Sequence, residues 1–225
     1  MDLDTTQGKE GHEKILSAFA EREADILVGT QMIVKGHDFP GVTLVGVIAA
    51  DLSLYSNDYR AAEKTFQLLT QAAGRAGRGK DAGEVVIQTY NPDHYSIKAA
   101  ALADYQSFYR QEMAFRNIMG YPPAEHMLVL LVSAKQEEKA GAASTLLYNM
   151  VRALTEEMDD KPSIIGPARA SLSKINDIYR RVLYIKYRDY LTLIGIKNNL
   201  EQRMEESDTF RGINVQFDFN PLNSY

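Results

Sequence analysis

The chain has 225 residues, of which 45% are hydrophobic and 24% are charged, a composition typical of folded protein and large enough for two small domains. It contains no cysteine, which excludes disulfides and cysteine-ligated zinc within these residues. The net charge of -5 argues against a protein that coats DNA through bulk electrostatics. The longest apolar stretch, residues 42–50, is too short to span a bilayer and no secretion leader opens the chain, so we expect a cytoplasmic protein. The four histidines lack metal-ligand spacing, and no metal site is expected.

The first half of the chain alternates between helical and strand-like segments. The sequence predicts an amphipathic helix over residues 11–22 and strands over residues 26–29, 43–50 and 84–89, with helical sequence between the strands. Runs rich in β-branched residues that alternate with helices indicate a parallel sheet buried on both faces. The predicted fold of this half is therefore α/β.

Unusual polar residues follow two of these predicted strands. Thr30 and Gln31 come directly after the first strand, and Asp51 comes directly after the second. In open α/β sheets, ligands bind beyond the carboxyl ends of the strands. We therefore expect a ligand site at that edge of the sheet.

A helix is predicted over residues 97–119, where Ala101, Phe108, Phe115 and Met119 follow one stripe. The sequence Gly120-Tyr-Pro-Pro123 ends this helix, because glycine and proline disfavour its continuation. We expect the domain boundary at this point, which gives domains of residues 1–119 and 120–225.

The second domain is expected to be α+β. Its predicted elements follow the order β-α-β-β-α-β, which is typical of a ferredoxin-like split βαβ fold. The predicted elements are a strand over 127–134, a helix over 137–158, a strand near 164–165, a strand over 181–187, a helix over 190–205 and a strand over 213–219.

The segment Gln71-Ala-Ala-Gly-Arg-Ala-Gly-Arg78 is the most informative in the chain. Gln71, Arg75 and Arg78 have the spacing i, i+4 and i+7, which places them on one face if the segment is helical throughout. Arginine suits a nucleotide phosphate because its planar group donates hydrogen bonds in pairs and keeps its charge. The alternative is a solvated helix end capped by Gly79.

Two segments together carry a resemblance to known helicases. The segment from Gly29 to Pro40 resembles motif V of superfamily 2 helicases, and the segment from Gln71 to Arg78 resembles their motif VI. Further landmarks are similar to the primosomal protein N-prime family, the superfamily 2 replication-restart helicases. These landmarks are Asp51-Leu-Ser-Leu54, Asp58-Tyr-Arg-Ala-Ala-Glu63, Gly120-Tyr-Pro-Pro123, Gly166-Pro-Ala-Arg169, Tyr179-Arg-Arg181 and Val215-Gln-Phe-Asp-Phe-Asn-Pro221.

The resemblance implies a partial RecA-like helicase lobe, the second lobe of the motor, followed by the ferredoxin-like domain. The activity it implies is ATP-driven 3'-to-5' DNA translocation at stalled forks, with reloading of the replicative helicase. Arg75 and Arg78 would be arginine fingers directed at ATP, and Gln71 would contact its phosphates or the attacking water. An arginine finger contributes roughly 10³ to 10⁵ to turnover in nucleotide hydrolases.

The same resemblance assigns four residues near the first motif. Gly36 and Asp38 would lie near the nucleotide. Thr30 and Gln31 would contact the DNA backbone and couple it to the state of ATP.

The sequence departs from the helicase pattern in two respects. It contains no G-x-x-x-x-G-K-[ST] phosphate loop, and it lacks the cysteine pairs of the family's zinc-binding insertion. ATP with Mg²⁺ would therefore be bound mainly by a first lobe absent from these residues, and zinc only by the absent insertion. We expect an excised carboxy-terminal fragment without ATPase activity of its own, the alternative being a natural short protein.

Basic and aromatic residues alternate in the second domain. Residues 161–188 contain seven basic residues and one acidic residue, a net charge of +6, so the rest of the chain carries -11. Arg180, Arg181, Lys186 and Tyr187 are therefore candidates for binding DNA phosphates and bases. A solvated basic face without a ligand is the alternative. The resemblance implies DNA or the acidic tail of single-strand-binding protein as partner, with other primosome proteins, and a monomeric chain.

Two other functions remain open at this point. Another superfamily 2 translocase would share the Q-x-x-G-R-x-G-R pattern, although Gly120-Tyr-Pro-Pro123 argues against it. A non-enzymatic adaptor would use a degenerate lobe only to display the second domain. The intact Gln71, Arg75 and Arg78 argue against such decay.

Overall fold

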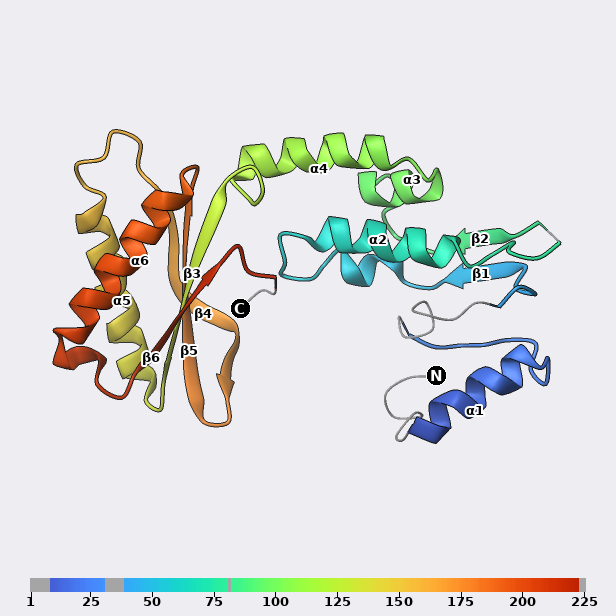
Figure 1. The fold of residues 1–225 in the computed structure, drawn as a ribbon, viewed down its shortest axis with the longest axis horizontal. Helices are drawn as coiled ribbons and strands as arrows, with labels where there is room; N and C mark the ends of the chain where they lie inside the picture. The colour runs from blue at the N-terminus through green and yellow to red at the C-terminus, as the bar shows by residue number, and fades with distance from the viewer. Residues whose placement is uncertain (1–8, 31–38, 81, 223–225) are drawn as a thin grey trace. The chain divides into compact units, whose positions relative to one another are not determined.

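The computed structural model describes residues 9–30, 39–80 and 82–222, which form two compact units (Figure 1). The N-terminal unit comprises Met1–Ser56 and Arg60–Gln111, and the C-terminal unit comprises Asn57–Tyr59 and Glu112–Tyr225. The expected boundary after residue 119 is thus corrected in two ways. The last turns of the preceding helix join the C-terminal unit, and so does a short segment from the first half of the chain.

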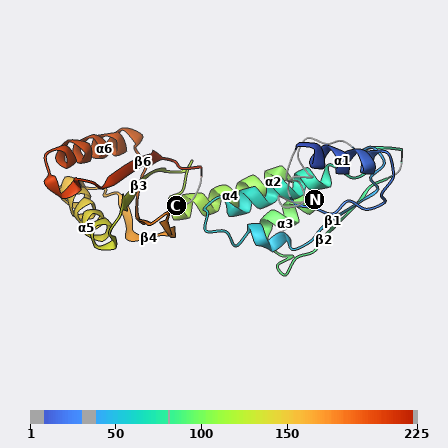
Figure 2. The ribbon, with the colours of Figure 1, turned by 90° about the horizontal axis from the view of Figure 1, so that it is seen from below.

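The N-terminal unit contains a parallel two-stranded sheet of β1 (Leu44–Val47) and β2 (Glu84–Ile87). Figures 1 and 2 show these strands side by side from perpendicular directions. Exposed and half-buried side chains alternate along both strands, so the expected burial of both faces does not hold for the described residues. The helical segments of this unit are α1 (Lys9–Ala20), the 3-10 helix η2 (Ala50–Ser53), α2 (Ala61–Ala73), α3 (Tyr95–Ala101) and the first part of α4 (Tyr105–Met119).

The strand predicted over residues 26–29 is not observed. Ile26 and Val28 are exposed, and this stretch has no regular secondary structure. A strand needs a partner for its backbone hydrogen bonds, and none of the described strands pairs with these residues. The apolar run alone was therefore not enough to predict a strand.

The helix predicted over residues 97–119 is two helices, α3 and α4. The chain turns at Ala103, where φ is 50°, and the Asp104 carboxylate then accepts a 2.9 Å hydrogen bond from the Ser107 amide. The break allows α3 and α4 to pack separately against α2. Phe66 of α2 stacks on Phe108 of α4 with ring centroids 4.2 Å apart.

The C-terminal unit has the predicted β-α-β-β-α-β order. Its four strands form an antiparallel sheet in the order β4-β5-β3-β6, and α5 and α6 lie side by side on one face of it (Figure 1). No helix in the described part of the chain has the length and apolarity that crossing a membrane requires. The elements are β3 (His126–Ala134), α5 (Glu137–Leu154), β4 (Ser163–Ile175), β5 (Ile178–Tyr187), α6 (Tyr190–Glu205), the 3-10 helix η3 (Asp208–Phe210) and β6 (Asn214–Phe219).

The core of this unit lies between the sheet and its two helices. Leu128 and Leu130 of β3, Leu147 of α5 and Leu193 of α6 are fully buried there. Side chains alternate between the two faces of a strand, so the residues of β3 and β5 that do not enter this core point to the other face of the sheet. That second face has its own smaller cluster, in which Val129 and Val182 are buried.

Candidate functional site

The predicted nucleotide-contacting residues lie where α2 ends. Gln71 is exposed in the last turn, but the helix stops at Ala73 and Gly74 caps it, donating its amide to the Thr70 carbonyl at 3.0 Å. Arg75 follows in a tighter turn, with its amide bonded to the Ala72 carbonyl at 3.0 Å. The expectation of one helical face shared by Gln71 and both arginines is therefore wrong, because the helix does not persist to Arg78.

Close backbone packing fixes the turn between the two arginines. Gly77 has a φ of +71° and donates its amide to the Val42 carbonyl at 3.0 Å. A Cβ at Gly77 would lie 2.6 Å from the Gly83 backbone nitrogen, so a larger residue does not fit without displacement. Arg78 is exposed and its Nε donates to the Gly74 carbonyl at 2.7 Å, whereas Arg75 is half-buried.

The predicted site residues do not share one edge of the sheet. The Gly77 amide bonds just before β1 begins, so the arginine turn lies near the amino ends of the strands. Asp51 lies beyond their carboxyl ends. The ligand edge expected from Thr30, Gln31 and Asp51 is therefore separate from the arginine turn, and it stays a prediction. Thr30 is exposed outside regular secondary structure, while Gln31, Gly36 and Asp38 lie outside the described residues.

Asp51 joins the carboxyl ends of β1 and β2. Its carboxylate accepts hydrogen bonds from the Thr89 hydroxyl at 2.7 Å and from the Tyr90 amide at 2.8 Å. These bonds, the Thr89 bond first, lower the pKa of Asp51 below its ordinary value of 3.8. In the described part of the chain, Asp51 therefore has a structural role, because it links the ends of the two strands. Its position after a predicted strand did not indicate this role.

The predicted DNA-binding residues of β5 are divided between the two faces of the sheet. Tyr187 packs against the main core, and Arg181 shares its face by strand alternation. Arg180 and Lys186 point to the opposite face. These four residues therefore do not form one continuous surface, because alternation separates neighbours that looked adjacent in the sequence.

Among the predicted DNA contacts that the structure describes, Lys186 is the most enclosed. It is 6% exposed, its ammonium donates a hydrogen bond to the Met119 carbonyl at the end of α4, and it lies 4.5 Å from the centre of the Tyr121 ring. Burial lowers the pKa of Lys186, and the nearby Glu125 carboxylate partly opposes this effect. The side chain is thus used inside the C-terminal unit, and its contact with DNA would require it to leave this environment.

Two acidic residues outside the stretch, Glu137 and Asp160, compensate part of its +6 charge. One oxygen of Glu137 accepts 3.0 Å hydrogen bonds from both Arg169 and Arg181, and Arg188 pairs with Asp160 at 3.1 Å. Glu137 and Asp160 lie outside the counted stretch, so the sequence count missed them. Solvent-exposed pairs such as Arg188–Asp160 contribute only about 0 to 1 kcal/mol.

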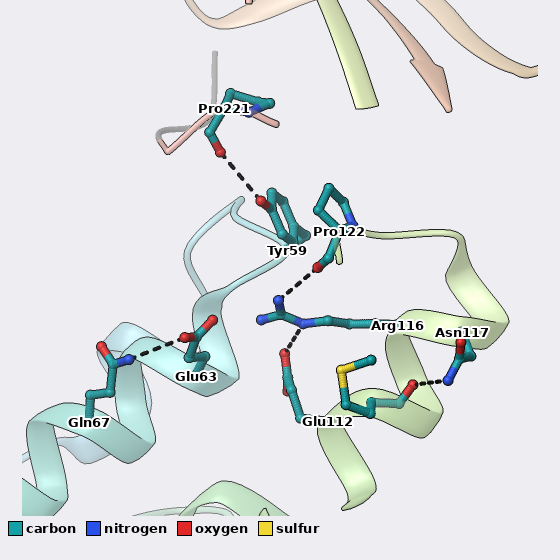
Figure 3. A network of polar contacts seen from close by, with 9 residues as sticks. Tyr59, Glu63, Gln67, Glu112, Arg116, Asn117, Pro122 and Pro221 are labelled. Carbon is teal, nitrogen blue, oxygen red and sulfur yellow. Dashed lines mark hydrogen bonds and ion pairs between the residues drawn. The ribbon is translucent and has the colours of Figure 1, made fainter. Parts of the chain in front are cut away.

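A buried ion pair near the end of α4 was not predicted. Glu112 Oε1 accepts a 2.7 Å bond from Arg116 Nε, and Arg116 also donates to the Pro122 carbonyl at 2.7 Å (Figure 3). The signal was available, because Glu and Arg four residues apart on a helix face each other. The pair ties the last turns of α4 to the segment that follows, which explains why they belong to the C-terminal unit.

Two family descriptions match this chain. Residues 117–222 match the Primosomal protein N C-terminal domain, and residues 2–80 match the Helicase conserved C-terminal domain. The first match covers the four-stranded sheet, α5 and α6, and the second covers the segment that ends with the arginine turn. The two halves of the chain thus match separate families.

Similar curated proteins match the chain across both halves. The chain is 43% identical over 221 residues to replication restart protein PriA of Bacillus subtilis, and 39% identical over 224 residues to that of Synechocystis. It is 34% identical over 222 residues to that of Treponema pallidum. Each match covers 98% of this chain but only 27%, 26% and 33% of the three relatives. The chain therefore spans less than two thirds of the length of these relatives.

Proposed function

We propose that the chain is the carboxy-terminal part of a replication-restart DNA helicase, because residues 117–222 match the primosomal protein N C-terminal domain family and residues 2–80 match the helicase C-terminal domain family. The observation that carries the proposal is the continuity of the match, since 98% of the chain aligns with replication restart proteins at up to 43% identity. The proposed parent activity is 3'-to-5' translocation driven by ATP at stalled forks.

Arg75 and Arg78 carry the proposed chemistry. Hydrolysis builds negative charge on the transferred phosphoryl group, and arginine side chains held in advance stabilise that charge without further reorganisation. The glycine-packed turn supports this role because it fixes the backbone on both sides of Gly77. Gln71, in the adjoining last turn of α2, is proposed to contact the phosphates or the attacking water.

Other components are proposed to come from the rest of the protein. ATP and Mg²⁺ bind mainly to a first lobe that carries a phosphate loop, which this chain lacks. Zinc has no cysteine ligand here and belongs to the proposed insertion. Thr30 and Gln31 are proposed to contact the DNA backbone, and Gly36 and Asp38 to lie near the nucleotide.

The purified 225-residue chain is expected to release no phosphate from ATP, with or without single-stranded DNA, because arginine fingers stabilise nothing unless a nucleotide is held. The longer protein is expected to hydrolyse ATP when DNA is added and to unwind a duplex with a 3' single-stranded tail. Phosphate release and strand separation measure the two activities. DNA-stimulated turnover by the chain alone, or a longer protein that unwinds nothing, contradicts the proposal.

We further propose that the C-terminal unit binds DNA weakly through its basic residues, the half-buried Arg180 and Arg181 among them. Each phosphate contact on a single strand contributes about -0.7 to the slope of log affinity against log salt. Replacing Arg180 and Arg181 together by alanine is expected to flatten the slope measured on the 225-residue chain by about one unit. Fluorescence anisotropy with a labelled oligonucleotide at several salt concentrations gives this slope.

Arg203→Ala is the matched control, because Arg203 is an exposed arginine in the last turn of α6, outside the predicted surface. Its slope is expected to equal that of the unchanged chain. Capture of an acidic carboxy-terminal peptide of single-strand-binding protein, without DNA binding at low salt, identifies the surface as a protein-docking site instead. Tyr187→Ala is not a clean test of base stacking, since Tyr187 packs against the core.

A further inference from the structure

Four side chains of the C-terminal unit form a continuous cationic and aromatic stack. Tyr59 and Tyr121 lie nearly parallel, with ring centroids 5.2 Å apart and an interplanar angle of 17°. The Arg116 guanidinium lies 5.5 Å from the Tyr59 ring centre, and the Lys186 ammonium lies 4.5 Å from the Tyr121 ring centre. Each cation is thus attracted to the face of one ring, and the two rings contact each other.

Additional bonds hold the Tyr59 end of this stack in place. The Tyr59 hydroxyl donates to the Pro221 carbonyl at 3.4 Å, 162 residues away along the chain (Figure 3). Arg116 is itself fixed by Glu112 and by the Pro122 carbonyl. Tyr59 is therefore anchored by its ring and by its hydroxyl to elements from the last half of the chain.

The anchored segment lies between two parts of the N-terminal unit. Asn57–Tyr59 belongs to the C-terminal unit, although the chain before it and after it belongs to the other unit. Helix α2 begins at Ala61, two residues after Tyr59, and its last turn is followed by Arg75 and Arg78. The chain therefore passes between the two units next to the start of α2, as well as within α4.

Helix α2 is packed along its length, with buried residues from Ala61 to Ala72. Its 13 residues span about 20 Å at 1.5 Å per residue. The buried Thr65 hydroxyl makes bonds of 2.8 Å to the Ala61 carbonyl and 2.9 Å to the Ser53 hydroxyl, and Phe66 stacks on Phe108. These contacts hold the backbone of α2 between its first and last turns, so a restraint at the first turn could be passed along the helix.

We propose that Tyr59 is a positioning residue for ATP hydrolysis, which couples the state of the C-terminal unit to the arginine turn through α2. This inference rests on the proposed function, because it assigns Tyr59 a task in that reaction. The proposed role of Tyr59 needs no contact with nucleotide or DNA. It acts by restraining the first turn of the helix whose carboxyl end leads to Arg75 and Arg78.

The first test needs no hydrolysis and uses the 225-residue chain. Amide hydrogen exchange of residues 64–68 is expected to become about tenfold faster in Tyr59→Ala, because the anchor of the first turn is lost. Tyr59→Phe keeps the ring stack and is expected to stay within about twofold of the unchanged chain. Tyr55→Ala is the matched control, since Tyr55 lies in the same connecting segment but is 72% exposed.

The second test measures steady-state hydrolysis by the longer protein. Tyr59→Ala and Tyr59→Leu are expected to lower the DNA-stimulated kcat at least fivefold, while KM for ATP and the rate without DNA stay within about twofold. Tyr59→Leu keeps an apolar side chain but removes the ring face, and circular dichroism checks that it folds. Tyr59→Phe is expected to restore most of the stimulation.

If the amide exchange rates of residues 64–68 are unchanged in Tyr59→Ala, Tyr59 does not restrain α2 and the proposal is wrong. Equal loss of the stimulated and unstimulated rates in Tyr59→Ala and Tyr59→Leu also overturns it, since that is the result of a merely structural role. A longer protein that hydrolyses no ATP in its unchanged form contradicts the proposed function instead. In that case the exchange measurement alone still tests whether Tyr59 restrains α2.

Discussion

Replacing either Arg75 or Arg78 by alanine is expected to lower DNA-stimulated ATP hydrolysis by the longer protein by about 10³-fold or more, while fork binding stays nearly unchanged. The two functions separate because the arginines are proposed to stabilise charge that exists only in the transition state. Phosphate release measured with and without forked DNA gives the rates, and anisotropy on the same fork gives the affinity.

Two further variants sharpen this experiment. Arg75→Lys keeps the positive charge but loses the planar pair of donors, so it is expected to recover little activity. Arg110→Ala is the matched control, because Arg110 is an exposed arginine of α4 whose Nε donates a hydrogen bond to the Gln106 carbonyl. If both alanine variants keep more than about a tenth of the normal turnover, they are not arginine fingers.

Glu112→Ala is expected to lower the free energy of unfolding of the C-terminal unit by about 3 to 5 kcal/mol. The Glu112 and Arg116 side chains are only 5% and 8% exposed, so removal of the carboxylate leaves a buried guanidinium without its anionic partner. Urea unfolding followed by circular dichroism measures the loss. Glu112→Gln is expected to lose less, since an amide oxygen still accepts from Arg116 Nε.

The control for this variant is Arg188→Ala, which removes an ion pair of the same unit between Arg188 and Asp160 whose side chains are 71% and 54% exposed. Its effect is expected to be at most about 1 kcal/mol, because solvent screens exposed pairs. A loss below about 1 kcal/mol in Glu112→Ala shows that the buried pair does not stabilise the unit. Replacement of both residues by Leu and Met is expected to recover part of the stability.

Local signals were enough to predict the C-terminal unit. The apolar alternation of β3 and the helical spacing of α5 and α6 report packing against a single core, and the structure confirms their order. The start of α5 at Glu137 and the whole of α6, Tyr190–Glu205, agree with the sequence prediction. The strand near residues 164–165 proved longer, because its pairing with β5 continues past two irregularities in register that no apolar pattern marks.

The candidate sites were predicted less completely, because they depend on how distant segments pair. The spacing of Gln71, Arg75 and Arg78 suggested one helical face, yet Gly77 bonds to Val42 and turns the chain away. Lys186 was indistinguishable in the sequence from a surface lysine until its bond to Met119 was seen. Tyr59 gave no signal at all, since its partners lie between 57 and 162 residues further along the chain.

The shared carboxylate of Glu137 has a consequence for the proposed binding of DNA phosphates. Because Arg169 and Arg181 already bind one internal anion, a phosphate that reaches them exchanges places with a group of the protein. Replacement of the Glu137 carboxylate by a phosphate would release fewer counterions than binding of the same phosphate to unpaired arginines. If the C-terminal unit binds DNA as proposed, Glu137 would compete with each phosphate for Arg169 and Arg181, and a ligand that places several phosphates at once would overcome this competition best.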